Sequence, residues 1–276
     1  MRRYGVSIGL LAIVLVFPGL LALGCGSSAT TTTTATSSTT LSAVPTGDFI
    51  VSAAASLKAA FTEFGGTFAT KSGVTPTFNF AASGVLQKQI EGGAPVEVFA
   101  SASPKQVDAL TKENLVDPST TASFAGNDIV LIVPAGSTLG ITGFADLTKP
   151  EVKKITTGDP QTAPHGVSAI EVLTSLKLLD QVKPKLVYSA NAAQTIDYVA
   201  RGEVDAGISF FSDAKGNDKV KIIATADQTL YTPVKYVVTV VKAAKNPAAA
   251  KAFIALLLSD EGQALLATFG FRPAPK

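Results

Sequence analysis

Four segments with hydrogen-bonding potential share one position in the predicted fold, the point where a strand passes into a helix. Ser56 follows the first predicted strand and Ser83 the second, while the turn around His165 and Asn191 follow two later strands. The first turn of a helix has main-chain N–H groups without intrahelical acceptors and carries a partial positive charge. Several helix starts directed at one point therefore bind an anion without Lys or Arg. We expect such an anion site, to which the hydroxyls of Ser56 and Ser83 add donors.

The three residues before Ser56 are all small. The stretch 51–61 reads VSAAASLKAAF, an apolar strand that leads through three alanines into a serine and a helix. A buried strand normally ends in turn residues such as Gly, Asn or Pro. Small residues in their place indicate that another group approaches the main chain closely here. We expect this group to be the oxygen atoms of a ligand.

Ordinary structural roles compete with these interpretations. A serine at a helix start is most often an N-cap, and Asn191 with Gln194 has the spacing of a capping box. A single histidine between Pro and Gly is typical of a solvated turn, so the ring of His165 is expected at the cleft rim or in solvent. At Asn191, only the N–H groups that follow it are expected to bind the anion.

The first half of the folded part alternates strands and helices. Strands are predicted at 49–53, 74–82 and 96–101, and helices at 57–71, 84–93 and from 104 onward. Ser103, Pro104 and Gln106 have the types and spacing of an N-cap, a first helical residue and the N3 position of a capping box. This alternation is typical of an α/β fold with a mostly parallel sheet.

The second half repeats this order and predicts a second lobe. Strands are predicted at 153–159, 184–189 and 205–211, a loop at 160–166, helices at 167–179 and 192–202, and two helices within 246–271 capped by Asn246 and Ser259. Two long strands, 126–136 and 231–241, are expected to cross between the lobes. We therefore predict two α/β lobes, 48–129 with 231–276 and 130–230, separated by a cleft that strand-to-helix loops line.

Composition and charge exclude several classes of protein. A chain of 276 residues with 46% hydrophobic residues can bury one large core or two smaller ones. The formal charge of +2 comes from Arg2 and Arg3, and the remaining charges balance. No cluster of Lys and Arg is present to follow a nucleic acid backbone, so no nucleic acid partner is expected.

The first 47 residues predict export and attachment to a membrane. Residues 1–25 have a basic start, an uncharged apolar stretch and a final Cys25, the only cysteine. This pattern is typical of a bacterial lipoprotein signal, after which Cys25 is lipidated. An uncleaved transmembrane anchor is the alternative, because the apolar stretch is about long enough to span a bilayer. Residues 26–47 are rich in Ser and Thr and are expected to be a tether.

Five segments of this sequence resemble the molybdate-binding proteins of ABC transporters. They are AAASL at 53–57, FAASGVLQKQIEGGAPVEVFAS at 80–101, GDPQTAPHG at 158–166, GEVDAGISFFSDA at 202–214 and FGFRP at 269–273. The resemblance extends over essentially all of 48–276. It implies the type II periplasmic-binding-protein fold, in which two α/β lobes close on a ligand. It also implies a monomeric extracytoplasmic receptor for molybdate or tungstate that has no cofactor and delivers its ligand to an ABC permease.

The resemblance assigns roles to five positions. Ser56 and Ser83 match the two serines whose hydroxyls hold the oxyanion, and His165 and Ala192 match positions that contribute main-chain N–H groups. The family's ligand-binding tyrosine corresponds to Phe210, which has no hydroxyl to donate. This contact is therefore expected either to be missing or to be supplied by water or a neighbouring hydroxyl such as Ser209 or Ser212. A charge-assisted hydrogen bond contributes about 1.5–3 kcal/mol, so its loss without replacement would weaken binding about tenfold or more. No side chain is expected to coordinate a metal directly. His165 is a second departure, because the family has a small residue there.

Other functions remain open on the sequence alone. A serine hydrolase needs a base beside its nucleophile, but the chain has no G-x-S-x-G elbow and one histidine. A metal enzyme needs a cluster of ligands, and no histidine cluster is present. A binding protein for sulfate, phosphate or a small organic anion is the main alternative, and it is distinguished from a molybdate receptor by the anion that it binds.

Overall fold

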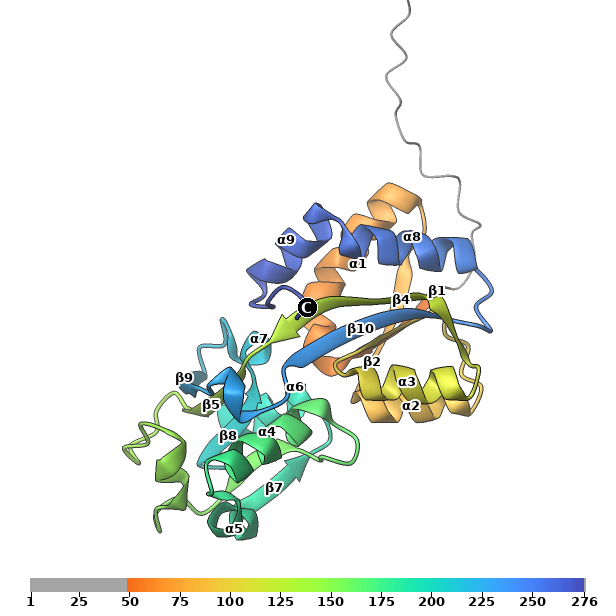
Figure 1. Cartoon of the computed structure of the whole chain (residues 1–276). Helices are drawn as coiled ribbons and strands as arrows, with labels where there is room; N and C mark the ends of the chain where they lie inside the picture. Colours follow the sequence, from red (N-terminus) through yellow and green to blue (C-terminus); the bar gives the residue numbers. More distant parts are fainter. Residues whose placement is uncertain (1–48, 276) are drawn as a thin grey trace, which may run out of the picture. The chain divides into compact units, whose positions relative to one another are not determined.

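The computed structural model describes residues 49–275, which lie in one compact unit (Figure 1). The predicted signal segment 1–25 with Cys25 and the predicted tether 26–47 lie outside the described residues. Within 49–275, none of the helices is long and apolar enough to cross a membrane.

The first sheet has five strands in the order β2-β1-β3-β10-β4. Their bounds are β1 Phe49–Ala54, β2 Pro76–Ala81, β3 Val98–Ser101, β4 Val116–Asn127 and β10 Val234–Val241. The three strands nearest the start of the chain pair in parallel, and β10 pairs antiparallel with both β3 and β4. Strands β1, β2, β3 and β4 therefore run in the same direction and β10 runs opposite to them, so the expectation of a mostly parallel sheet is confirmed. Strand β10 is the exception because it returns from the other lobe and enters this sheet in the opposite direction.

The second sheet repeats this arrangement with the order β7-β6-β8-β5-β9. Its strands are β5 Ile129–Pro134, β6 Ile155–Gly158, β7 Leu186–Ser189, β8 Ala206–Phe210 and β9 Val220–Thr225. Here β6 pairs in parallel with β7 and β8, and β5 pairs antiparallel with β8 and β9. Strand β9, and β4 over most of its length, were not predicted.

Helices cover both faces of the first sheet (Figure 1). They are α1 Lys58–Ser72, α8 Pro247–Leu258 and α9 Asp260–Thr268 on one face, and α2 Ser83–Glu91 and α3 Pro104–Lys112 on the other. Phe253 of α8 packs against Phe61, Phe64 and Phe68 of α1, with ring centroids 4.9–5.8 Å apart. These phenylalanines recur at three- and four-residue spacings in α1, which is why one face of this helix is buried.

The second sheet is flanked by shorter helices. They are α4 Pro164–Ser175, α5 Leu179–Val182, α6 Ala192–Ala200 and α7 Phe211–Ala214. Short 3-10 turns complete the fold at η1 Ala55–Leu57, η2 Phe144–Thr148, η3 Lys183–Lys185 and η4 Gln228–Leu230. Ile196 and Val199 of α6 pack with Val130 and Ile132 of β5 in one apolar cluster.

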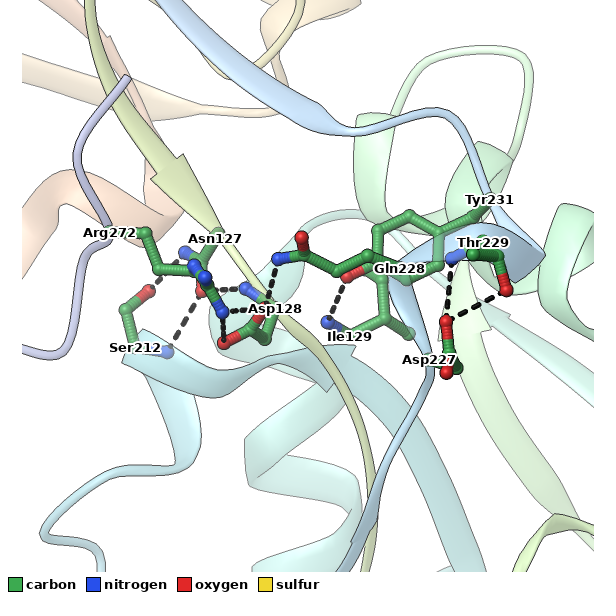
Figure 2. A network of polar contacts seen from close by, with 9 residues as sticks. All are labelled: Asn127, Asp128, Ile129, Ser212, Asp227, Gln228, Thr229, Tyr231 and Arg272. Atoms are coloured by element: carbon green, nitrogen blue, oxygen red, sulfur yellow. Dashed lines mark hydrogen bonds and ion pairs between the residues drawn. The ribbon is translucent and has the colours of Figure 1, made fainter. Parts of the chain in front are cut away.

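The chain crosses between the sheets twice. The predicted strand 126–136 is divided at Asp128, since β4 ends at Asn127 in one sheet and β5 begins at Ile129 in the other. Arg272 Nη1 lies 3.2 Å from both carboxylate oxygens of Asp128, and Gln228 Nε2 donates to the same carboxylate at 3.0 Å (Figure 2). The return crossing runs from η4 to β10. Side chains from distant parts of the sequence therefore hold the two crossings together.

Three of the six N-cap interpretations are confirmed. The side chains of Ser103, Asn191 and Ser259 accept hydrogen bonds from main-chain N–H groups in the first turns of α3, α6 and α9. Asn246 precedes α8 but makes no side-chain cap, so that prediction was wrong. Its main-chain N–H donates to the Glu97 carboxylate at 2.8 Å instead.

Candidate functional site

The five predicted site residues line one cavity between the two sheets. Ser56 and Ser83 contribute from the first lobe, and His165, Ala192 and Phe210 from the second. The cavity volume is about 10 Å³. The remaining lining residues are mostly small: Ala54, Ala55, Ala81, Ala82, Ala102, Ala163, Pro164 and Asn191.

Ser56 lies in η1, directly after β1, and it is not an N-cap. The residue before η1 is Ala54, and no side chain caps this turn. The Ser56 hydroxyl instead lies 2.8 Å from the hydroxyl of Tyr236 in β10. The N-cap interpretation of Ser56 was therefore wrong.

Ser83 is the first residue of α2 and is fully buried. Its N-cap interpretation was wrong too, because Ala82 holds that position. The Ser83 Oγ accepts a hydrogen bond from the Ala102 main-chain N–H at 3.0 Å. Since this contact uses an acceptor position of the oxygen, the hydroxyl hydrogen stays available to a group in the cavity.

The expectation that the His165 ring lies at the rim or in solvent was wrong. The ring is 2% exposed, and its Nε2 lies 3.1 Å from Thr195 Oγ1. The helix α4 begins at Pro164, three residues before its predicted start, and this places His165 in the first turn rather than in a loop. A Cβ on Gly158 would lie 2.4 Å from His165 Cε1, so this glycine makes room for the ring.

Burial keeps the imidazole neutral. Desolvation lowers the pKa of His165 to about 3, so the ring carries no charge near neutral pH. The remaining side chains of the cavity lining are those of Ala, Ser, Pro, Asn and Phe. Any anion held here is therefore held by neutral donors. The main-chain N–H groups of His165 and Ala192 lie in first helical turns, where no intrahelical acceptor is available.

Phe210 ends β8 between two other rings. Its centroid lies 5.6 Å from that of His165 and 5.8 Å from that of Tyr236. Ser209 and Ser212 do not line the cavity, so neither replaces the absent tyrosine hydroxyl in this arrangement. Ser209 Oγ is buried without a hydrogen-bond partner in the described structure, and Ser212 Oγ accepts from Asn127 Nδ2.

One main-chain hydrogen bond joins the lobes next to the cavity. The N–H of Gly84, at the start of α2, donates to the carbonyl of Thr162 at 2.9 Å. A Cβ added to Gly84 would lie 2.8 Å from that carbonyl oxygen and 3.0 Å from Thr162 Cα. Both of these are main-chain atoms, so the close approach of the lobes requires glycine at this position.

A larger cleft of about 450 Å³ adjoins the cavity and shares Ala102, Ala163 and Pro164 with it. Lys105, Lys235 and Glu171 line this cleft and provide its charged groups. Within residues 49–275, no cluster of three or more His, Cys, Asp or Glu has the geometry to hold a metal ion.

Two residues that connect to Ser56 by hydrogen bonds, Tyr236 and Asn127, were not predicted from the sequence. Tyr236 is fully buried, and Asn127 Nδ2 donates to its hydroxyl at 3.2 Å. The sequence carried one signal for Tyr236, a single hydroxyl-bearing aromatic residue among the valines of β10. A buried tyrosine hydroxyl needs a partner, but the pattern could not say which one.

Comparison with known proteins shows that this chain is similar to bacterial solute-binding proteins. A model of the family described as bacterial extracellular solute-binding protein matches residues 49–272. YvgL of Bacillus subtilis, provisionally named an ABC transporter substrate-binding lipoprotein, is 32% identical over 271 residues, which are 98% of each chain. The molybdate-binding protein ModA of Haemophilus influenzae is 36% identical over 197 residues, 70% of this chain and 77% of its own.

The fold is shared with a solved structure. The periplasmic molybdate-binding protein of Azotobacter vinelandii matches with a TM-score of 0.76 at 23% identity, over 83% of this chain and 100% of its own. At this identity the likeness speaks for the fold alone. The predicted two-lobed periplasmic-binding-protein fold is thereby confirmed.

Proposed function

The chain belongs to the family of bacterial extracellular solute-binding proteins, and on this premise we propose that it binds molybdate in the cavity between its lobes. It is the solute-binding component of an ABC transporter and not an enzyme, and such components work with a permease. The proposal adds the ligand, its binding site and its delivery to that permease.

One observation carries the proposal. Ser56 and Ser83 from one lobe face the first turns of α4 and α6 from the other, around a cavity without a charged side chain. Fixed dipoles of this kind stabilise a dianion without the strong attraction of a fully charged cage. Such a site suits a receptor that must also release its ligand.

The relatives and the donor set favour molybdate over other tetrahedral oxyanions. ModA of Haemophilus influenzae, a relative at 36% identity, is named for binding molybdate. Tungstate has nearly the same size as molybdate, so we propose that it binds too. Sulfate and phosphate are smaller, and a protonated phosphate needs an acceptor where this site offers donors.

Ligand entry requires the lobes to move apart. A cavity of about 10 Å³ holds about one water molecule, whereas a tetrahedral oxyanion has five heavy atoms. We propose that the lobes 48–129 with 231–276 and 130–230 separate to admit the anion. The hydrogen bond between Gly84 and Thr162 breaks as they separate, and the lobes then close around the anion with a wider cavity than they enclose without it.

We also propose that the protein is exported and held at the membrane by a lipid on Cys25. The support is the signal pattern of residues 1–25, together with the name of the relative YvgL, which includes the word lipoprotein. A monomer on a tether of residues 26–47 would stay close to its permease.

Thermal unfolding of residues 26–276 in the presence of single anions tests the ligand. A ligand that binds only the folded state stabilises it by about 2.7 kcal/mol at a hundred times its dissociation constant. We expect molybdate and tungstate to raise the melting temperature, with smaller effects of sulfate and phosphate. A melting temperature that rises with sulfate and not with molybdate would instead support the alternative of a sulfate receptor.

A further inference from the structure

The strength of the proposed site depends on where the hydroxyl hydrogen of Ser56 points. Ser56 Oγ lies 2.8 Å from Tyr236 Oη, and geometry alone permits either oxygen to donate. If Ser56 donated to Tyr236, it would present lone pairs to the cavity and repel an anion. The direction of this one hydrogen bond therefore decides whether Ser56 attracts or repels the ligand.

The side-chain amide of Asn127, which is bonded to the Tyr236 hydroxyl, determines that direction. Its Oδ1 accepts from two main-chain N–H groups, that of Asp128 at 3.0 Å and that of Ser212 at 3.3 Å. The reversed amide would set its NH₂ group against these two donors, so the orientation is determined. Figure 2 shows Asn127 and Ser212 facing each other across the first crossing. Asn127 Nδ2 is thereby left to donate to Ser212 Oγ at 2.8 Å and to Tyr236 Oη at 3.2 Å.

Tyr236 must then donate to Ser56. Its hydroxyl is fully buried and has two hydrogen-bond partners in the described structure, Asn127 Nδ2 and Ser56 Oγ. The amide NH₂ group of Asn127 is a donor and cannot accept the phenolic hydrogen. The carboxylate oxygen Asp213 Oδ2 has no hydrogen-bond partner, so it does not accept this hydrogen either. Ser56 Oγ is the remaining acceptor.

We infer that Asn127 and Tyr236 are positioning residues for oxyanion binding, because they direct the Ser56 hydroxyl hydrogen into the cavity. Neither of them lines that cavity. Each group donates a hydrogen bond to the next: Asn127 to Tyr236, Tyr236 to Ser56, and Ser56 to the anion. This inference rests on the proposed function of the cavity as an anion site.

Ser83 is also held as a donor, by a single main-chain N–H group. It accepts from the Ala102 main-chain N–H, which can only donate, so its own hydrogen is also left for the cavity. Both serines are thus held as donors by groups behind them. For Ser56, the role as donor depends on both lobes. The two N–H groups that orient the Asn127 amide belong to Asp128, which follows β4 of the first sheet, and to Ser212, which lies in α7 beside the second.

Calorimetric titration of residues 26–276 with sodium molybdate tests the inference when Tyr236→Phe is combined with each serine substitution. Tyr236→Phe should weaken binding about five- to tenfold in the wild-type background and in Ser83→Ala. In Ser56→Ala, where there is no hydroxyl to direct, the further loss should be less than about twofold. The matched control is Tyr231→Phe. This change removes a buried hydroxyl that accepts a hydrogen bond from the Ile129 main-chain N–H at 3.4 Å (Figure 2). That hydroxyl takes no part in the hydrogen bonds between Asn127, Tyr236 and Ser56. The control variant should leave the affinity unchanged.

The outcomes separate the inference from the proposed function. An equal loss in all three backgrounds, or no loss in the wild-type background, would overturn the positioning role while leaving molybdate binding intact. If the wild-type protein binds sulfate and not molybdate, the ligand is wrong and the same cycle with sulfate still decides the positioning role. Binding of neither anion would overturn both. Should Tyr236→Phe fail to fold, Asn127→Ala removes the donor behind Tyr236 and is expected to show the same dependence on Ser56.

Discussion

The rings of His165 and Phe210 are in contact, with centroids 5.6 Å apart and an angle of 56° between their planes. These are the two positions at which the sequence departs from the pattern of the family that it resembles. The larger side chain of His165 and the missing hydroxyl of Phe210 therefore occur together in one small space. We interpret them as a coupled pair of changes rather than two separate losses.

This contact predicts that the two positions do not act independently. Phe210→Tyr adds a hydroxyl to a ring that is 1% exposed and flanked by His165 and Tyr236. We expect little gain in molybdate affinity from Phe210→Tyr alone, because the imidazole of His165 already packs against this ring. Combined with His165→Ala, it should bind more tightly than His165→Ala alone, by about tenfold for one charge-assisted hydrogen bond. Equal gains with and without the histidine, measured by titration calorimetry, would contradict the coupling.

Removal of either proposed donor should weaken molybdate binding. Ser56→Ala and Ser83→Ala each delete a hydroxyl from the cavity wall, and we expect a loss of about tenfold or more from each. Ser83→Ala also leaves the Ala102 N–H without its acceptor, so its free energy of unfolding should fall by about 1–3 kcal/mol. The control is Ser259→Ala, which removes the N-cap of α9 away from the cavity. It should cost about 1 kcal/mol of stability and leave the dissociation constant unchanged.

Much of the fold followed from local patterns in the sequence. The phenylalanine spacing in α1 and the caps at Ser103, Asn191 and Ser259 depend on residues close together in the chain, and these were predicted. The direction of β10 was not, because strand pairing joins residues more than a hundred positions apart.

The candidate site was predictable in part for the same reason. Ser56 and Ser83 stand where strands pass into helices, and that signal is local. The partner of Ser56 was not predictable, since Tyr236 is 180 residues away and meets it through the pairing of β10. His165 was misplaced because its ring meets Thr195, 30 residues further along the chain, and packs against Phe210.

The contact between Gly84 and Thr162 predicts that a methyl group at Gly84 keeps the lobes apart. Gly84→Ala would place its Cβ 2.8 Å from the Thr162 carbonyl oxygen. We expect weaker molybdate binding, because the main chain must move to relieve this clash. The matched change is Gly66→Ala in α1, where an added Cβ meets nothing within 4 Å. That variant should bind normally and gain up to about 1 kcal/mol from helix propensity, so an equal loss of affinity in both variants would rule out a specific role for Gly84.

A carboxyl group with one buried oxygen, that of Asp213, makes the stability of the protein depend on pH. Desolvation raises the pKa of Asp213 to about 7, and its Oδ2 has no hydrogen-bond partner in the described structure. The folded state therefore keeps a proton that the unfolded state releases near pH 4, and the free energy of unfolding falls as pH rises from about 4 to about 7. Asp213→Asn should reduce this slope and raise the melting temperature at pH 8. If the melting temperatures of the two proteins change in parallel between pH 4 and pH 8, Asp213 is not the cause of the pH dependence.

The most direct test of the anion site is a crystal structure with molybdate that locates the metal by its anomalous scattering. We expect one molybdenum peak in the small cavity, with its oxygen atoms within hydrogen-bonding distance of the hydroxyls of Ser56 and Ser83. A peak in the adjoining cleft near Lys105 and Lys235, with neither serine in contact with the anion, would contradict a site built from neutral donors.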